Sequence, residues 1–176
     1  MRRKDVATGV EDPPETTTVT EVAADTIVVR VDERTERIFS REWNIIEQKV
    51  DEKVTFKATP QRKFLQFPLE VGKKWEGRWE TTSLTQETRW TASAEVEAIE
   101  SVTVPAGTFQ AFKVKFQGTY NGRAFATGRG SWTGSRQETA WYAPAVKRVV
   151  KMQWQERSGN YNNRVINELQ SFTLAP

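Results

Sequence analysis

The chain of 176 residues contains no cysteine and no histidine. It therefore has no thiol or imidazole that could act as nucleophile, general base or soft metal ligand, and it can form no disulfide. Long apolar runs are also missing, because no window approaches the roughly 18 apolar residues of a membrane-spanning helix. Polar residues follow Met1 directly, so no signal peptide is expected in this chain. These absences argue against thiol and imidazole enzymes, most zinc and copper proteins and any transmembrane segment, and we expect no cofactor.

The chain also has no large excess of positive or negative charge. The 26 basic and 23 acidic residues give a net charge of +3 and are spread along the chain in short clusters. A nucleic-acid-binding protein more often carries a basic stripe. Lys113 and Lys115 alternate with Phe112 and Phe116, so the charges and the rings are expected on opposite faces of a strand. The sequence therefore predicts no nucleic-acid partner.

The sequence does contain many stretches in which apolar and polar residues alternate. Residues 102–116 predict two strands joined by a tight turn, in which Pro105 presets the first corner and Gly107 adopts a positive φ. A second stretch, 88–100, is expected to form a long strand with small residues on one face. The residues of that face are Trp90, Ala92, Ala94, Val96 and Ala98. Such a face leaves room for large side chains opposite it or for a cavity.

Turn signals divide the rest of the chain into further strands. They are expected over 16–23, 26–31, 43–50, 53–58, 74–82, 124–142, 148–157 and 161–174. Asn121-Gly122 is typical of a two-residue hairpin turn, and glycines 128, 130 and 134 favour bends in the strand that follows. No window shows a sustained helical period. We therefore expect an all-β protein with a single antiparallel, strongly curved sheet, an open or partly closed barrel, and little or no helix.

The length suits one domain. Residues 1–15 are polar and include Pro13-Pro14, so we expect a flexible N-terminal segment or a partial edge strand there. Residues 16–176 then form the single β domain, with an apolar connector at 64–69. The spacing of apolar residues after Val19 is weakly similar to the spacing after Val96. This similarity leaves open whether the domain consists of two similar halves that meet near 60–70.

Aromatic side chains are the best candidates for binding. The candidate ligand-binding residues are Trp75, Trp79, Trp90, Trp132, Trp141, Tyr142 and Trp154. These side chains could fill the core of a curved sheet, line a cavity for a lipid-like molecule, or form a flat platform for sugars. Because Trp141 and Tyr142 are adjacent on an expected strand, at least one of them must leave the main core.

Carboxylates are the remaining candidates for catalysis, and the densest group is Glu95, Glu97 and Glu100. Glu95 and Glu97 are expected on the polar, solvated face of their strand. A polysaccharide-cleaving enzyme would need two carboxylates converging beside tryptophans across a cleft. The stretch 127–130 is glycine-rich but precedes no helix, so it does not predict a phosphate site. We therefore expect no catalytic residue, no metal site and no enzymatic activity.

Three stretches together resemble a known family. They are Phe67-Pro68-Leu69-x-Val71-Gly72-Lys73-x-Trp75, Val104-Pro105-Ala106-Gly107-Thr108-Phe109-x-Ala111-Phe112 and Trp141-Tyr142-Ala143-Pro144-x-Val146. This pattern is similar to that of the TapB-like group of uncharacterised bacterial envelope proteins. The resemblance implies an open β half-barrel like that of lipoprotein carriers, and a location in the periplasm or at the outer membrane. It implies no catalytic residue. The chain departs from the family in lacking a leader and in carrying Ala145 and Lys147 where glycine is frequent.

Two hypotheses of function follow. The first is a non-enzymatic bacterial envelope protein that holds an apolar, lipid-like ligand or a partner segment on the concave face of its sheet. The alternative is a structural scaffold subunit of an envelope assembly that binds another envelope protein through a sheet edge.

Overall fold

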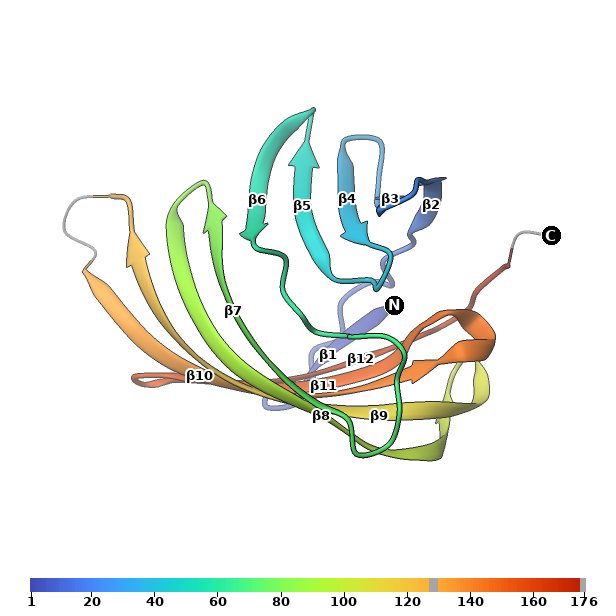
Figure 1. Cartoon of the computed structure of the whole chain (residues 1–176). Helices are drawn as coiled ribbons and strands as arrows, with labels where there is room; N and C mark the ends of the chain where they lie inside the picture. Colours follow the sequence, from blue (N-terminus) through green and yellow to red (C-terminus); the bar gives the residue numbers. More distant parts are fainter. Residues whose placement is uncertain (127–129, 175–176) are drawn as a thin grey trace.

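The computed structural model describes residues 1–126 and 130–174, and the strands of this part form one twelve-stranded antiparallel sheet (Figure 1). The strands are β1 (Arg2–Asp5), β2 (Thr18–Val22), β3 (Thr26–Arg30), β4 (Thr35–Ser40), β5 (Ile45–Val50), β6 (Lys53–Thr59), β7 (Lys74–Ser83), β8 (Gln86–Val104), β9 (Gly107–Ala124), β10 (Ser131–Ala143), β11 (Arg148–Ser158) and β12 (Tyr161–Glu168). From β2 to β12 each strand pairs with the next along the chain, and β1 pairs with β12. A 3-10 turn, η1 (Pro144–Val146), follows β10. No helix of the described residues is long and apolar enough to cross a membrane.

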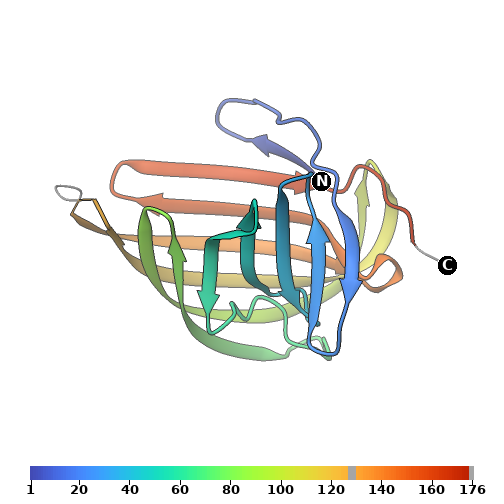
Figure 2. The same ribbon diagram turned by 90° about the horizontal axis from the view of Figure 1, so that it is seen from above.

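The sheet is curled but not closed. The long strands β7 to β12 form a bowed floor, and the short strands β3 to β6 cross above its concave face (Figures 1 and 2). The two parts meet where β6 pairs with the end of β7, through residues 56–59 and 80–83. The two edge strands, β1 and β2, do not pair with each other. The prediction of a single, strongly curved antiparallel sheet is confirmed.

The main core lies on the concave face of the long strands. Across the middle of this face, Gly77, Ala92 and Gly118 stand opposite one another on β7, β8 and β9. Their small size lets large side chains from the neighbouring rows and from the connector 60–73 pack over the strands. The buried residues of this core are Ala58, Phe64, Leu65, Leu69, Trp75, Trp79, Ala92, Ala94, Val96, Val114, Phe116, Ala140 and Tyr142. The protein's own side chains therefore fill much of the space above the small residues.

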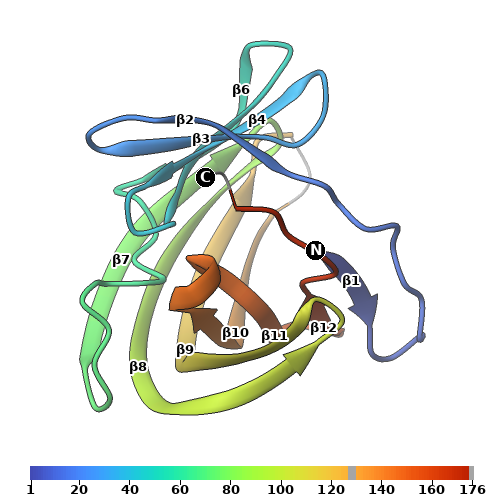
Figure 3. The same cartoon turned by 90° about the vertical axis from the view of Figure 1, so that its right-hand side faces the viewer.

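A second, smaller core lies on the opposite face. A bulge between Val96 and Ala98 shifts the register of β8 against β9, so the residues beyond it exchange faces. Ala98, predicted on the same face as Val96, consequently leaves it and pairs with Lys113. The far end of the β8–β9 hairpin bends around the ends of β10 and β11 (Figure 3). The buried residues here are Val102, Val104, Ala111, Trp141, Ala143, Val146 and Val150.

The prediction of a turn at Asn121-Gly122 is wrong. β9 continues through both residues, and Asn121 pairs with Arg89 on one side and Thr133 on the other. Gly122 serves close packing instead, because a Cβ placed there would lie 2.2 Å from the indole of Trp132. Of the glycines expected to bend the next strand, Gly134 lies within β10 and Gly130 precedes it, whereas Gly128 lies outside the described residues.

The N-terminal residues take part in the sheet. β1 pairs with β12, which agrees with the partial edge strand predicted for this segment. Flexibility of residues 1–15 in solution stays a prediction. The two parts of the sheet join at the connector 60–73 but differ in strand length, with 5 to 7 residues in β2 to β6 and 8 to 19 in β7 to β12. Their common origin stays a hypothesis.

Candidate binding surface on the concave face

Six of the seven predicted ligand-binding residues lie on the concave face. Strand pairing and alternation place Trp75, Trp79, Trp90, Trp132, Tyr142 and Trp154 there. Trp141 lies on the opposite face in the second core, with its neighbour Tyr142 in contact with the main core. The prediction that these two neighbours point apart is confirmed by this arrangement. Trp75, Trp79, Trp141 and Tyr142 are buried, whereas Trp90, Trp132 and Trp154 remain partly exposed.

An aromatic row crosses three strands of this face. Trp79 on β7 stacks on Trp90 of β8, with ring centroids 5.7 Å apart and planes inclined by 5°. Trp90 in turn contacts Tyr120 of β9 at a centroid distance of 4.4 Å. Cross-strand aromatic neighbours of this kind stabilise a sheet beyond the area that they bury. Tyr120 was not among the predicted residues, although its alternation with Phe116 on β9 could have placed it here.

Tyr120 completes the row by lying flat across Gly134. A Cβ at Gly134 would stand 2.4 Å from the Tyr120 ring, so only glycine leaves room for the phenol. The Tyr120 hydroxyl donates a hydrogen bond of 2.7 Å to the Glu156 carboxylate. Burial and this neighbouring carboxylate raise the pKa of Tyr120 to about 12, because both disfavour the phenolate. Tyr120 is therefore a neutral donor at physiological pH.

Trp132 and Trp154 extend the aromatic surface beyond this row. Trp132 covers Gly122 on the neighbouring strand. The ring of Trp154 lies under the guanidinium of Arg136, whose Cζ is 4.2 Å from the ring centroid. Such a cation–π contact holds a flat aromatic side in a fixed orientation. Trp90, Trp132 and Trp154 are the predicted residues of the concave face that stay partly exposed, and we call these three side chains the aromatic shelf. Trp154 pairs with Glu138, six residues along β10 from Trp132, so Gly134 and Arg136 lie between the two tryptophans.

The connector 60–73 occupies the neighbouring part of the concave face. Phe64 and Leu65 are buried in the main core, and Asn44 holds their backbone. The Asn44 Oδ1 accepts hydrogen bonds of 2.8 Å from the N–H groups of Phe64 and Leu65, and the Asn44 Nδ2 donates to the Leu65 carbonyl at 2.7 Å. Trp75 Nε1 donates to the Lys63 carbonyl at 2.8 Å. The concave face thus already holds a chain segment without regular structure that buries Phe64, Leu65 and Leu69.

A buried ion cluster joins the connector to the sheet. Glu138 is 1% exposed, and its Oε2 accepts hydrogen bonds from Arg62 at 2.7 Å and from Arg136 at 3.0 Å. The Arg62 guanidinium also lies 4.6 Å from the ring centroids of Phe64 and Phe116. Burial by itself would raise the pKa of Glu138, but the two guanidinium groups outweigh it and hold that pKa below its usual value. Glu138 Oε1 and Arg62 Nε have no protein partner among the described residues.

Two surface hollows are lined by none of the seven predicted ligand-binding residues. The larger, of about 1040 Å³, lies beside the start of β2 and has a mainly charged lining that includes Arg30 and Asp32. The smaller, of about 460 Å³, lies at the β11–β12 turn and includes Tyr120 and Gly134. Neither hollow is the largely apolar pocket that is typical of small-molecule sites.

Trp43 is the tryptophan that the predicted site omitted. It lies in the β4–β5 turn with a φ of 61°, and its ring packs against the main core. The Arg148 guanidinium lies over this ring, 4.0 Å from its centroid. No periodic pattern marks Trp43, because it is placed by a turn and not by strand alternation.

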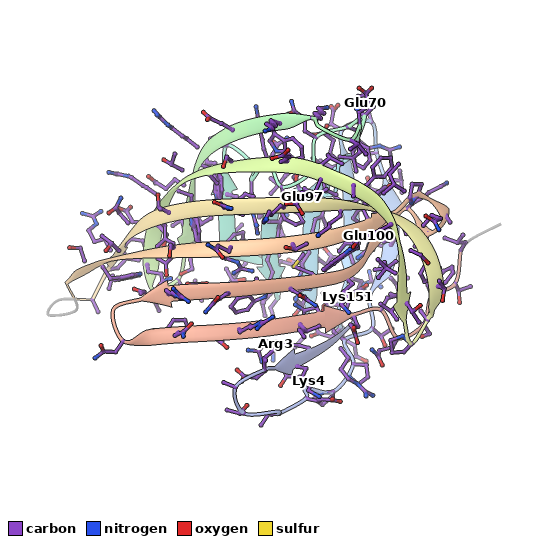
Figure 4. All side chains as sticks on the ribbon, turned by 90° about the horizontal axis from the view of Figure 1, so that it is seen from below. Arg3, Lys4, Glu70, Glu97, Glu100 and Lys151 are labelled. Carbon is purple, nitrogen blue, oxygen red and sulfur yellow. The ribbon has the colours of Figure 1, made fainter. Side chains whose placement is uncertain are left out.

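The candidate carboxylates form ion pairs and hydrogen bonds and do not converge. Glu97 pairs with Lys113 at 3.2 Å and with Lys115 at 2.9 Å on the convex face, which Figure 4 shows from below. Glu100 accepts a hydrogen bond of 2.6 Å from Trp141 Nε1. The described residues contain no group of three acidic side chains placed to hold a metal ion.

Comparison with known proteins relates this fold to three solved structures. A candidate lipoprotein from Parabacteroides distasonis matches with a TM-score of 0.53 and 14% identity over 97% of this chain and 91% of that one. The hypothetical lipoprotein YmcC from Escherichia coli matches with a TM-score of 0.53 and 9% identity over 98% and 84%. A candidate exported protein with a YmcC-like fold from Bacteroides fragilis matches with a TM-score of 0.50 and 13% identity over 97% and 92%. No family model and no curated protein matches the chain.

At these identities the likeness shows the fold alone. The curled, open sheet is shared with proteins described as lipoproteins or as exported, and their descriptions name no activity. The comparisons show the fold that this chain shares with those proteins, and they do not confirm the TapB-like name. That finer identity stays a hypothesis.

Proposed function

We propose that this chain is a non-enzymatic envelope protein, of the periplasm or the outer membrane, that holds an apolar ligand on its concave face. The observation that carries this proposal is that the aromatic shelf of Trp90, Trp132 and Trp154 stays partly exposed on the concave face. Apolar rings left open on a concave surface favour an apolar partner, because binding removes them from water.

The connector supports the same proposal. Phe64, Leu65 and Leu69 show what kind of group the curved face accepts, namely apolar side chains on a segment whose buried backbone groups are satisfied by hydrogen bonds. A lipid chain or an apolar segment of a partner would offer apolar groups to the same face. The ligand would lie along the shelf as a continuation of the connector.

The fold neighbours support the proposed location. Each of the three is described as a lipoprotein or an exported protein, and each covers nearly all of this chain. An envelope location supplies lipid-like ligands in abundance, which agrees with an apolar surface left open. The absence of catalytic activity is part of the proposal and rests on carboxylates that are engaged by Lys113, Lys115, Arg62 and Trp141.

The experiment is a titration with N-phenyl-1-naphthylamine, whose fluorescence rises in an apolar environment. We expect saturable binding, competition by a long-chain fatty acid, and at least about tenfold weaker binding for Trp132→Ala with Trp154→Ala. Both side chains are partly exposed, so the double variant should keep the fold, which circular dichroism checks.

The matched control is Leu84→Ala. Leu84 is 71% exposed in the β7–β8 turn, outside the shelf, so its loss should leave binding unchanged. Equal weakening by the control and the shelf variant, or no saturable binding by the native chain, would contradict the proposal.

A further inference from the structure

The two edges of the sheet are treated differently by the chain. Along the outer side of β1, residues 10–15 run antiparallel and cover the edge. Their backbone bonds are Asp12 N–H to the Arg3 carbonyl at 2.9 Å, Glu15 N–H to the Met1 carbonyl at 2.7 Å and Asp5 N–H to the Val10 carbonyl at 2.9 Å. Ion pairs of Arg3 with Asp12 and of Lys4 with Glu11 add to this cover. The β1 edge is thus satisfied from within.

The β2 edge has no such cover. All five of its residues, Thr18–Val22, are exposed, and β2 pairs with β3 alone in the described part of the chain. Val19 is 43% exposed and Val22 is 58% exposed. An edge strand presents a row of N–H and C=O groups that another strand can pair with. A bulge between Val19 and Glu21 interrupts the row, which limits pairing to strands that accommodate it.

The larger hollow adds a charge preference to this edge. Thr16 and Thr18 contribute to its lining, so it lies where β2 begins. Its acidic residues are Asp32, Glu33, Glu36, Asp51 and Glu52, and its basic residues are Arg30, Arg34 and Lys49. Arg34 pairs with Asp51 and Arg30 with Glu36, whereas Glu33 and Glu52 form no ion pair with the described residues. The hollow therefore favours a basic group.

We propose that β2 is a docking edge for an extended segment of another protein, which adds as a further antiparallel strand. All pairs of this sheet are antiparallel, so the added segment would end beside Thr18, at the acidic hollow. The partner is consequently a short, β-branched segment followed on its C-terminal side by lysine or arginine. Exposed Glu21 in the middle of the edge further disfavours an acidic residue opposite it. This inference is independent of the ligand on the concave face.

The test uses fluorescence polarisation with labelled synthetic peptides. The main probe has alternating valine and threonine residues followed by two lysines at its C-terminal end. One control peptide carries two glutamates in place of the lysines, and the other carries the two lysines at its N-terminal end. We expect the main probe to bind at least about tenfold more tightly than either control peptide. N-methylation of alternate backbone amides in the probe should abolish binding, because the docking relies on backbone hydrogen bonds.

Two variants locate the site. Glu33→Lys with Glu52→Lys should weaken binding of the lysine probe about tenfold, whereas Glu70→Lys with Glu76→Lys, the same charge change at exposed positions elsewhere, should not. Thr20→Pro should abolish binding while circular dichroism stays unchanged, since an edge strand tolerates proline.

Three results would overturn the inference: equal binding of the lysine and glutamate peptides, undiminished binding of the N-methylated probe, or no binding at millimolar peptide. A concentration-dependent dimer in light scattering that Thr20→Pro removes would also overturn it, because a second copy of this chain would then occupy the edge.

Discussion

At the scale of single residues, glycine and aromatic side chains form complementary pairs on the concave face. Tyr120 lies over Gly134 and Trp132 lies over Gly122, with each ring in the space where a Cβ would stand. Flat rings on bare backbone let the sheet keep its strand spacing and still bury large apolar areas. These glycines are needed for close approach and not for an unusual φ.

The pairing predicts that Gly134→Ala is strongly destabilising. Its Cβ would meet the Tyr120 ring at 2.4 Å and the Arg157 carbonyl oxygen at 2.8 Å, so both the side chain and the backbone must move. We expect a loss of about 2 kcal/mol in the free energy of unfolding, measured with urea. Gly77→Ala is the control, because its Cβ would make ordinary contacts at 3.6 Å or more. Similar losses in the two variants would contradict the pairing.

The buried ion cluster predicts a pH-dependent contribution to stability. Because the pKa of Glu138 is held below its usual 4.5, its stabilisation is complete above that pH and is lost as the pH falls through the folded-state pKa. We expect Glu138→Gln to lower the free energy of unfolding by about 3 kcal/mol at pH 7, since Arg62 and Arg136 lose their counter-charge.

The difference between Glu138→Gln and the native chain should shrink steadily as the pH falls below 4.5. Urea unfolding at several pH values measures it. Glu95→Gln, which removes a surface carboxylate paired with Lys74, should change stability by less than about 1 kcal/mol. A difference for Glu138→Gln that stays constant between pH 7 and 3 would contradict the depressed pKa.

At the scale of elements, the connector 60–73 determines how much of the concave face remains open. It lacks regular structure, so its polar backbone must be satisfied by side chains when Phe64 and Leu65 are buried. Asn44 does this with three hydrogen bonds, and Arg62 adds the ion pair with Glu138. The connector is therefore held at Arg62 by Glu138 and at Phe64 and Leu65 by Asn44, with further hydrogen bonds at Lys63 and Phe67.

This arrangement predicts that Asn44→Ala releases the connector. The change leaves the N–H and the carbonyl of Leu65 buried without partners, and it leaves the Phe64 N–H with the Arg62 carbonyl alone, so we expect a loss of about 3 kcal/mol in unfolding free energy. Limited proteolysis should then cut within residues 60–66. Asn121→Ala, at an exposed strand position, should leave both readouts unchanged. An intact connector in the Asn44→Ala variant would contradict its role as the clamp.

Element by element, strand alternation predicted much of this fold. The hairpin around Pro105 and Gly107, the long strand β8 and the opposed orientations of Trp141 and Tyr142 all follow from local pattern. The turn at Asn121-Gly122 failed because Asn-Gly is favoured in hairpins, yet this glycine is required by a tryptophan on the neighbouring strand. The clamp by Asn44 could not be predicted, since it joins residues 20 apart through a buried contact that has no sequence motif.

At the scale of the whole molecule, the sheet is a half-barrel partly filled by its own chain. The connector and the aromatic row fill much of the concave face, while the shelf of Trp90, Trp132 and Trp154 stays partly open. Three solved proteins described as lipoproteins or as exported share the curl at low identity. The proposed binding of an apolar molecule rests on these partly exposed tryptophans.

The most direct test is native mass spectrometry of the chain purified without detergent, beside its denatured mass. We predict an added mass that disappears on denaturation, extracts into organic solvent and is reduced in Trp132→Ala with Trp154→Ala. A bare chain that also takes up no long-chain fatty acid when incubated with it would contradict an apolar ligand on the concave face.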